Sequence, residues 1–353
     1  MADHPHKLRY GILSTGNIAR QFAHGVQEGA SLSTIHAVAS RDPRNALTFA
    51  NTYNIPKPHN SYDDLINDPN IDAIYVALPN NYHHEWTIRA LNAGKHVLCE
   101  KPLAVTTQQA TEMFQAAEQN DRHLAEAFMY LTHPLTKTYI QSIKNGDIGT
   151  PKLLRTSFSF SVAYPENNSR FSTALAGGSI MDIGCYCVTL ALLVADATTS
   201  PGSYPSQIHA IAHLHESGID DYAAVTLRFP NNLIVSFVSG MTAQMDNTTY
   251  ISGDNGYIQI PVPWKPPVQN ATFHIDHNIP SKQDKLAKPT GSSPNQKQSF
   301  NINTPNDKPL YALEADAFAD TILNDAPPFI TPEFSLRTAR ILDEIRSQIN
   351  LPF

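Results

Sequence analysis

Cysteines and long apolar segments are scarce in this sequence. Three cysteines among 353 residues are too few for the disulfide framework of a small secreted domain. Cys185 and Cys187 stand two positions apart, which is not the CxxC spacing of redox or zinc sites. The longest apolar runs, Ala73–Leu78 and Leu190–Ala195, have six residues each, whereas a membrane-spanning helix needs roughly 18 or more. We therefore expect no disulfide framework and no membrane span.

An excess of positive charge and an N-terminal export signal are also missing. Lys and Arg number 25 against 32 Asp and Glu, which gives a formal net charge of −7 and argues against a basic face for nucleic acid. The first residues, MADHPHKLRYGIL, lack a charged head followed by a long apolar stretch. We expect a cytoplasmic protein whose partners include neither nucleic acid nor a membrane.

The first 128 residues alternate short apolar runs with amphipathic stretches, which is the rhythm of a parallel sheet with crossover helices. We predict strands at Lys7–Leu13, Thr34–Ala39, Asp72–Leu78, His96–Cys99 and His123–Phe128. We predict helices at Asn17–Glu28, Pro43–Tyr53, Tyr82–Ala93 and Thr106–Asn120.

From residue 129 onward the pattern changes to that of a mostly antiparallel sheet. Helices are predicted at Pro134–Asn145, Ile180–Ala195, Leu310–Asn324 and Glu333–Ile349. Strands are predicted at Lys152–Phe160, Gln207–His215, Tyr222–Phe229, Leu233–Ser239, Thr249–Ser252 and Tyr257–Ile260. Ser281–Ser299 is rich in Lys, Gln, Pro, Ser and Gly and is interpreted as a surface loop.

A turn between the first strand and the first helix has the character of a dinucleotide-binding motif. The segment Ser14-Thr15-Gly16-Asn17-Ile18-Ala19 places a glycine where the backbone meets a diphosphate and an alanine where helix and strand pack. The amides at the start of the helix would face the anion. Ser14 replaces the usual first glycine, and the alternative is an ordinary turn of an α/β protein.

The end of the second strand bears on the choice of cofactor. An NAD-binding domain usually carries an acid here for the ribose hydroxyls, but this chain has Ser40 and Arg41. A hydroxyl and a guanidinium suit a 2′-phosphate, so we favour NADP, with NAD bound more weakly; Arg44 could add charge. The alternative is that Arg41 is a solvated loop residue and Asp42 only caps the next helix.

Several further segments resemble the Gfo/Idh/MocA oxidoreductase family. They run in the family's order along nearly the whole chain, and they are Ser14–Ala19, Leu78-Pro79-Asn80-Asn81-Tyr82-His83, Gly94–Pro102 with its Glu100-Lys101-Pro102, Glu126–Tyr130, Gly177-Gly178-Ser179, Asp182–Tyr186 and Gly253–Gly256. The resemblance implies a Rossmann dinucleotide-binding domain, residues 1–128. It also implies a second α/β domain with a large open sheet, residues 129–353, for substrate binding and oligomerisation.

The resemblance also implies roles for single residues. Lys101 stands as the catalytic lysine, before a cis proline bond, and Asp182 as the aspartate of the second motif. Tyr186 stands where many members have histidine, which resembles the branch of glucose–fructose oxidoreductase, NADP-dependent xylose dehydrogenase and dihydrodiol dehydrogenase. Many relatives carry an arginine where this chain has Leu131, so a substrate contact made by that arginine is not expected here.

The candidate site residues form three sets. The catalytic set is Lys101, Asp182 and Tyr186. The cofactor set is Ser14, Thr15, Gly16, Asn17, Ile18, Ser40, Arg41, Leu78, Pro79, Asn80, His83, Glu100 and Lys101. The substrate set is Tyr130, Asn168, Arg170, Asp182 and Tyr186.

The chemistry of the catalytic set suits hydride transfer from an alcohol, which needs a base for the hydroxyl proton. A lysine ammonium beside a tyrosine would lower the pKa of the phenol toward the working range. Asp182 lies one helical turn before Tyr186, so both would face one cleft. Singly, the three residues could also be a surface lysine, a helix N-terminal acid and a core tyrosine. His209, His213 and His215 share one strand face, but no metal is expected, because no acid is placed beside them.

We therefore predict NADP-dependent oxidation of an aldose such as xylose or glucose at C1 to the lactone. The alternatives are NADPH-dependent reduction of a keto or dicarbonyl sugar, oxidation of a trans-dihydrodiol and, from another class, a non-catalytic dinucleotide sensor. A homodimer or homotetramer through the second sheet is expected, because an open sheet face must be covered or wet.

Overall fold

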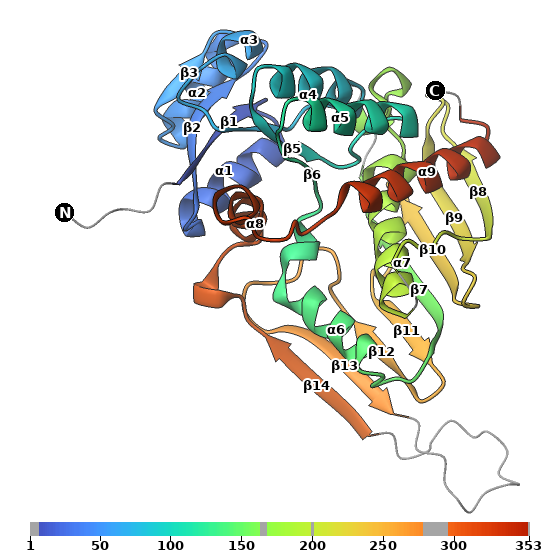
Figure 1. Ribbon diagram of the computed structural model, residues 1–353. Helices are drawn as coiled ribbons and strands as arrows, with labels where there is room; N and C mark the ends of the chain where they lie inside the picture. The colour runs from blue at the N-terminus through green and yellow to red at the C-terminus, as the bar shows by residue number, and fades with distance from the viewer. Residues whose placement is uncertain (1–6, 163–167, 199–200, 278–295, 352–353) are drawn as a thin grey trace, which may run out of the picture.

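The computed structural model describes residues 7–162, 168–198, 201–277 and 296–351. The chain forms two sheets with helices packed on them, one from each half of the chain (Figure 1). This is the α/β architecture that the hydropathy pattern predicts.

The first sheet is six-stranded, entirely parallel, and ordered β3-β2-β1-β4-β5-β6. Its strands are β1 (Leu8–Leu13), β2 (Ser33–Ala39), β3 (Lys57–His59), β4 (Ala73–Val76), β5 (His96–Glu100) and β6 (Leu124–Ala127). Its helices are α1 (Asn17–Gly29), α2 (Pro43–Thr52), α3 (Tyr62–Ile66), α4 (His83–Asn92) and α5 (Thr107–Gln119). The strand order reverses direction beside β1, so the carboxyl ends of β1 and β4 flank a natural ligand crevice.

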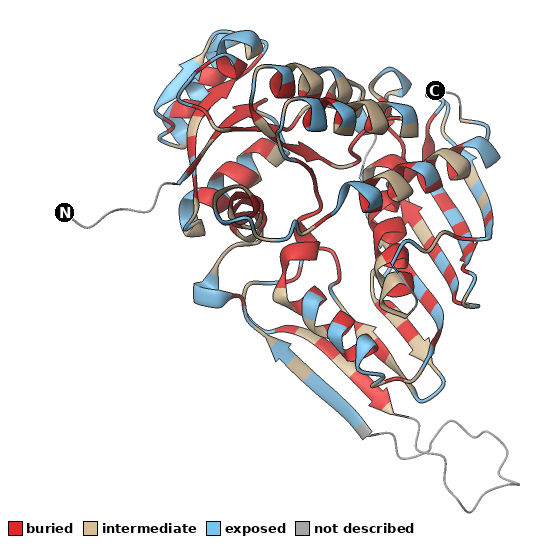
Figure 2. Ribbon diagram, in the orientation of Figure 1, coloured by how far each residue is buried: buried red, intermediate tan, exposed pale blue. Residues whose placement is uncertain are grey.

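The second sheet has eight strands in the order β14-β13-β12-β11-β7-β10-β9-β8, and only the β7–β10 pair is parallel. The strands are β7 (Pro151–Ser159), β8 (Gln207–Leu214), β9 (Asp220–Arg228), β10 (Ile234–Gly240), β11 (Thr249–Gly253), β12 (Gly256–Ile260), β13 (Ala271–His277) and β14 (Gln296–Ile302). Buried and exposed residues alternate along β9, whereas β4 is buried throughout (Figure 2). One face of the second sheet therefore builds the core and the other meets solvent.

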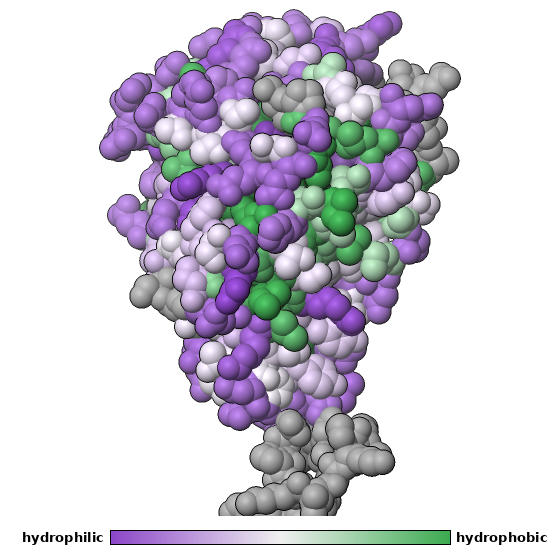
Figure 3. Space-filling model, turned by 90° about the vertical axis from the view of Figure 1, so that its right-hand side faces the viewer, coloured by the Kyte–Doolittle hydropathy of each residue, from purple (hydrophilic) through white to green (hydrophobic). Residues whose placement is uncertain are grey.

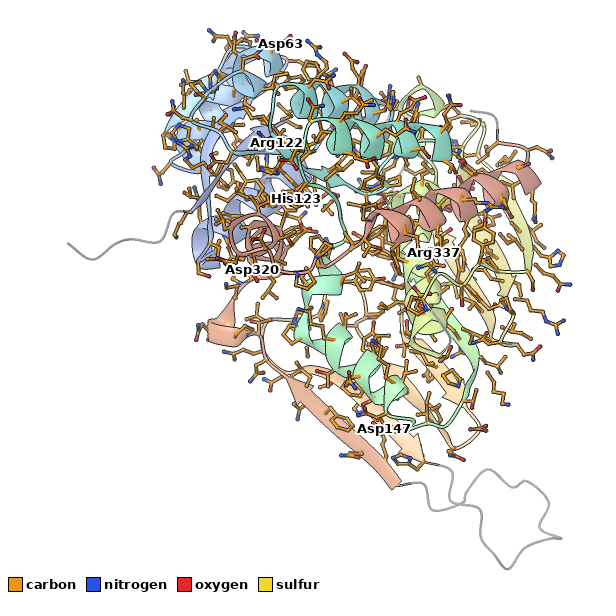
Figure 4. The ribbon with its side chains drawn as sticks, in the orientation of Figure 1. Asp63, Arg122, His123, Asp147, Asp320 and Arg337 are labelled. Atoms are coloured by element: carbon orange, nitrogen blue, oxygen red, sulfur yellow. The ribbon has the colours of Figure 1, made fainter. Side chains whose placement is uncertain are left out.

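The helices α6 (Pro134–Lys144), α7 (Cys185–Thr198) and α9 (Pro332–Gln348) cover the core face of the second sheet. The helical stretch Thr173–Thr198 is long and apolar enough to cross a membrane, but nearly all of it is buried in this core. Arg337 of α9 donates two hydrogen bonds, of 2.9 and 2.6 Å, to the Asp196 carboxylate and so ties α9 to α7 (Figure 4).

The helix α8 (Leu310–Asn324) returns to the first domain, where it packs beside α1 (Figure 1). The Tyr10 hydroxyl of β1 donates to the Ala315 carbonyl at 3.0 Å. The Asp316 carboxylate accepts hydrogen bonds from the Ser31 and Leu32 amides at 2.7 and 2.9 Å. The last part of the chain therefore completes the core of the first domain.

Four elements were not predicted, namely β3, α3, β13 and β14. The predicted loop Ser281–Ser299 is wrong at its end, because residues 296–299 belong to β14; residues 281–295 lie outside the described residues. The sequence of β14, QKQSFNI, is polar because it is an edge strand that pairs only with β13. Its strand character therefore does not show as an apolar run.

Candidate active site

The turn after β1 opens into a large pocket. Ser14, Gly16, Asn17 and Ile18 line it, whereas Thr15 does not. Ser14 adopts a φ of 119°, in the region that favours glycine. Its hydroxyl oxygen accepts a hydrogen bond from the Gly16 amide at 3.0 Å, which shows how a serine can hold this turn. The first amides of α1 are thus presented to the pocket.

The end of β2 places one cation at the pocket wall. Arg41 lines the pocket, while Ser40 is buried beside it and does not. Asp42 caps α2 by accepting the Arg44 amide at 2.9 Å, and the Arg44 side chain returns to the same carboxylate at 2.8 Å. Arg44 is therefore engaged by Asp42, whereas the guanidinium of Arg41 forms no ion pair within the described part of the chain and can meet a ligand.

The ends of β4 and β5 form the floor, with Leu78, Pro79, Asn80, Glu100 and Lys101 in the pocket lining. The peptide bond between Lys101 and Pro102 is cis, as the resemblance implied.

Besides Thr15 and Ser40, three more predicted contact residues do not line the pocket. His83 is fully buried, with ring nitrogens 2.8 and 2.9 Å from the Leu78 and Pro102 carbonyl oxygens. His83 therefore joins the turn that follows β4 to the turn that follows β5. The Tyr130 hydroxyl is buried against Thr189 at 2.8 Å. The Asn168 side chain caps a short helical turn by accepting the Arg170 amide at 3.1 Å.

The catalytic candidates meet on this floor. The Lys101 ammonium donates hydrogen bonds to the Asp182 carbonyl oxygen at 2.7 Å and to Asp182 Oδ1 at 3.1 Å. Arg170 Nε donates to Asp182 Oδ2 at 2.5 Å. The Lys101 nitrogen also lies 5.3 Å from the centre of the Tyr186 ring. One carboxylate is thus held between two cations, with the phenol beside them.

The hydroxyl of Tyr186 is the least satisfied group of this cluster. The residue is only 4% exposed, and its hydroxyl donates to the Met129 sulfur at 3.3 Å. A thioether is a weak acceptor, and no stronger partner is found among the described residues. The phenol is therefore free to exchange this contact for a substrate oxygen.

The electrostatics correct one prediction from the sequence. Burial raises the pKa of Tyr186 well above its usual value, and the nearby Glu100 raises it further. The expected lowering by Lys101 is wrong because the ammonium lies over the ring and is already paired with Asp182. Tyr186 is therefore a protonated phenol at neutral pH.

The lysine and the aspartate keep each other charged. Burial alone would lower the pKa of Lys101, but Asp182, together with Cys185 and Glu100, outweighs burial and the pKa is raised. Burial alone would raise the pKa of Asp182, but Lys101 and Arg170 outweigh it and the pKa is lowered. Both groups therefore stay ionised across the neutral range.

A buried acid of the second sheet supports the helix that carries Asp182. Asp220 is fully buried at the start of β9. Its Oδ2 accepts hydrogen bonds from the Ser179 hydroxyl and the Ile180 amide, both at 2.7 Å. Asp220, at the start of β9, therefore caps the π-helical turn Ile180–Gly184, which precedes α7. Adjacent Gly178 has a φ of 113°, and a Cβ there would stand 2.2 Å from Asp220 Oδ1.

The second domain supplies a wall that sequence reasoning missed. Phe158, Phe160, Trp264 and Lys265 line the pocket, which has a volume of about 880 Å³. Leu131 is buried and does not line it. The prolines of PVPWKPP mark an irregular segment, but no signal in the sequence places it against the first domain.

Comparisons with known proteins agree on one family. Residues 8–128 match the family model described as oxidoreductase family, NAD-binding Rossmann fold, and residues 137–259 match the GFO/IDH/MocA C-terminal domain. Trans-1,2-dihydrobenzene-1,2-diol dehydrogenase of Mus musculus is 34% identical over 260 residues, which are 73% of this chain and 76% of that protein. The Homo sapiens enzyme of the same name is 33% identical over 262 residues, 73% and 76% of the two chains.

Two solved structures are similar over nearly their whole length. One is a 3-ketoreductase from Actinomadura kijaniata in complex with NADP and TDP-benzene, with 26% identity, 98% of both chains covered and a TM-score of 0.82. The other is an aldose–aldose oxidoreductase from Caulobacter crescentus complexed with glycerol, with 25% identity, 98% of both chains covered and a TM-score of 0.81.

Proposed function

The chain belongs to the Gfo/Idh/MocA oxidoreductase family, and we propose that it interconverts a hydroxyl and a carbonyl on a small cyclic sugar or polyol with NADP. The observation that carries this proposal is the Tyr186 hydroxyl, which is buried at the pocket floor beside the Lys101–Asp182 pair. Its hydrogen-bond partner among the described residues is a thioether. The first candidate substrate is a sugar, either an aldose oxidised at C1 to its lactone or a keto sugar reduced in the opposite direction.

The pocket residues fit a dinucleotide. The start of α1 and the floor residues Pro79 and Lys101 line one continuous pocket, so a ligand can extend from the helix amides to the phenol. NADP, when bound, supplies or accepts the hydride. The protein's own residues have to hold the reacting carbon beside it and handle the proton.

The proton moves through Tyr186. In reduction, its hydroxyl donates a proton to the carbonyl oxygen as the carbon gains the hydride, which leaves the alcohol and a phenolate. In oxidation the same oxygen takes the hydroxyl proton. The Lys101 ammonium, fixed by Asp182, stabilises negative charge on the substrate oxygen in either direction.

The raised pKa of Tyr186 favours the reductive direction at neutral pH. A protonated phenol is a proton donor, whereas oxidation requires it to lose its proton first. We therefore expect oxidation to become faster with rising pH, and carbonyl reduction by NADPH to be the faster reaction at pH 7. A keto sugar is the matching substrate.

A trans-dihydrodiol is the second candidate substrate, and the aromatic wall favours it. Trp264 stacks on Phe158 with centroids 5.5 Å apart and lies 5.8 Å from Tyr186. Such a wall offers a flat apolar surface to a ring. The relatives at 34% identity carry this activity in their names. A non-catalytic sensor is disfavoured because Lys101, Asp182 and Tyr186 are all present and in contact range.

Initial rates decide among these substrates. The panel contains xylose and glucose with NADP, a keto sugar with NADPH, and trans-1,2-dihydrobenzene-1,2-diol with NADP. The substrate with the highest kcat/KM identifies the class. If none of them changes the absorbance of the reduced nicotinamide in either direction, the proposed function is wrong.

The preference for NADP rests on Arg41. A charged hydrogen-bond pair to a phosphate contributes roughly 1.5–3 kcal/mol, so Arg41→Ala should weaken NADP binding about tenfold or more and leave NAD binding nearly unchanged. Equal losses for the two cofactors would contradict this assignment.

The open face of the second sheet is the proposed oligomer interface. Leu153 and Ile234 are cross-strand neighbours on this face, 53% and 40% exposed, and Ile211 is 77% exposed. Seen from the side of β8, the molecule presents a band of hydrophobic surface (Figure 3), of the kind that marks protein interfaces. We expect light scattering to give at least a dimer mass, and Ile211→Asp with Ile234→Asp to give a monomer. A native monomer at micromolar concentration would contradict the proposal.

A cytoplasmic location is also proposed. Cys99, Cys185 and Cys187 are all free thiols in the core, which suits a reducing compartment. Fractionation of cells that express the protein would test this.

A further inference from the structure

A proline-rich segment between β12 and β13 forms part of the pocket wall. Its residues 261–265 all line the pocket. Trp264 anchors it, because the indole nitrogen donates to the Ser157 carbonyl at 2.8 Å and the ring stacks on Phe158. Pro263 and Pro266 flank the Trp264–Lys265 pair and restrict the backbone. The Cα position of Lys265 is therefore held in place before any ligand arrives.

The side chain of Lys265 reaches from the second domain to the first. Its ammonium donates to the Gln21 side-chain oxygen of α1 at 3.3 Å, and the Tyr311 hydroxyl donates to the same oxygen at 3.1 Å. Gln21 follows Asn17 by one helical turn on the same side of α1. The ammonium thus lies about one turn from the amides that begin this helix.

The ammonium of Lys265 makes no ion pair with any of the residues that the structure describes. Two pocket carboxylates act on it from a distance, those of Glu100 and Asp182. That of Asp182 is already held by Lys101 and Arg170. Burial lowers the pKa of Lys265, and the neighbouring Lys101 lowers it further. An ammonium held by a neutral amide among other cations is a site that favours an anion.

We propose that Lys265 binds the diphosphate of the dinucleotide, on the side opposite the α1 amides. This inference rests on the proposed function, since it requires that a nicotinamide dinucleotide occupies the pocket. The diphosphate is the anion that the start of α1 attracts, and rotation about the last bonds of the lysine brings its ammonium from Gln21 toward that point. The second domain then contributes directly to cofactor affinity.

The diphosphate is common to NADP and NAD, which makes the test specific. Lys265→Met should weaken NADPH, NADH and ADP-ribose by the same factor, about tenfold to a hundredfold for one charge-assisted hydrogen bond. Arg41→Ala should weaken NADPH alone. Lys265→Arg keeps the charge and should restore most of the affinity. Lys137→Met, at an exposed position of α6, is the matched control and should change nothing.

Dissociation constants come from nucleotide titrations of each purified full-length variant, with thermal unfolding to establish that the fold is intact. Equal affinities of the Lys265→Met variant and the native protein for all three nucleotides would overturn the inference. So would a rise in substrate KM with unchanged nucleotide affinity, because it would place Lys265 on the substrate. If the native protein binds no nicotinamide nucleotide, the proposed function itself fails, which is a different result.

Discussion

The buried carboxylate of Asp220 should make the stability of the protein depend on pH in an unusual direction. Burial raises the pKa of Asp220 from 3.8 to about 6, although the Ser179 hydroxyl and the Ile180 amide both donate to it. A carboxyl with a raised folded-state pKa costs stability when it is ionised. That cost is fully present well above pH 6. It disappears as the pH falls toward 3.8, the pKa of the carboxyl in the unfolded chain.

The cost can be worked out from the shift. A difference of about 2 pKa units at about 1.4 kcal/mol each amounts to ~3 kcal/mol at pH 8. At pH 5 the folded state holds most of its proton, and the cost falls to about 1.5 kcal/mol. Asp220→Asn keeps the size and one acceptor oxygen but carries no charge. Its advantage over the native protein should therefore shrink by about 1.5 kcal/mol between pH 8 and pH 5.

Urea unfolding of both proteins at the two pH values measures this change, because all other titrating groups cancel in the comparison. Asp221→Asn is the matched control. It is the next residue of β9 and also buried, but it contacts His213 Nδ1 and the Thr242 hydroxyl, each at 2.7 Å. The expectation that no acid stands beside the histidines of β8 is therefore wrong, because pairing of β8 with β9 brings Asp221 to His213. At pH 8 the Asp221→Asn control should have a lower free energy of unfolding than the native protein. The reasoning about Asp220 is refuted if the difference in unfolding free energy between Asp220→Asn and the native protein is the same at pH 8 and at pH 5.

Other substitutions test the site directly. Tyr186→Phe should lower kcat by roughly 10²–10⁴-fold with NADPH affinity preserved, as measured by steady-state rates and nucleotide titration; a near-native kcat would mean that another group carries the proton. Lys101→Met should abolish most turnover and shift the pH profile of the remaining activity, and an unchanged profile would remove the lysine from the mechanism. Gly178→Ala combines a φ of 113° with a Cβ 2.2 Å from a carboxylate oxygen, so it should destabilise the fold by about 1–3 kcal/mol or more. Gly146→Ala, with a φ of 79° and nothing within 4 Å, should cost less in the same thermal unfolding experiment, and equal losses would contradict the steric argument.

The first domain could be predicted closely because its strands, apart from β3, are largely buried on both faces. Continuous apolar runs such as that of β4 end at turn residues, so local pattern and fold agree. Short or polar elements could not be found in this way. The three residues of β3 are mostly exposed and are held by pairing with β2. The edge strand β14 pairs with β13, and its two apolar residues, Phe300 and Ile302, are too few to form an apolar run although they pack on the core.

The candidate site, too, could be predicted from the sequence only in part. Motif segments predicted which stretches of chain meet at the pocket, because each follows the end of a strand. They could not predict side-chain direction, so His83 and Tyr130, both within motifs, turn into the core. Nor could they predict burial, which reverses the expected pKa shift of Tyr186. Lys265, on the pocket wall, and Asp220, which caps the turn that carries Asp182, lie outside the motifs, and only the fold shows where they stand.

The return of α8 to the first domain has a consequence for the newborn chain. The hydrogen bond from Tyr10 to Ala315 joins residues 305 positions apart. At a synthesis rate of roughly 5–20 residues per second, about 15–60 s separate the two partners. During that interval the face of α1 that α8 will cover stays bare, although the dinucleotide turn has already emerged. A ribosome that stalls before Leu310 would thus release a polypeptide with every cofactor motif and an unfinished core, which is a target for chaperones and proteases.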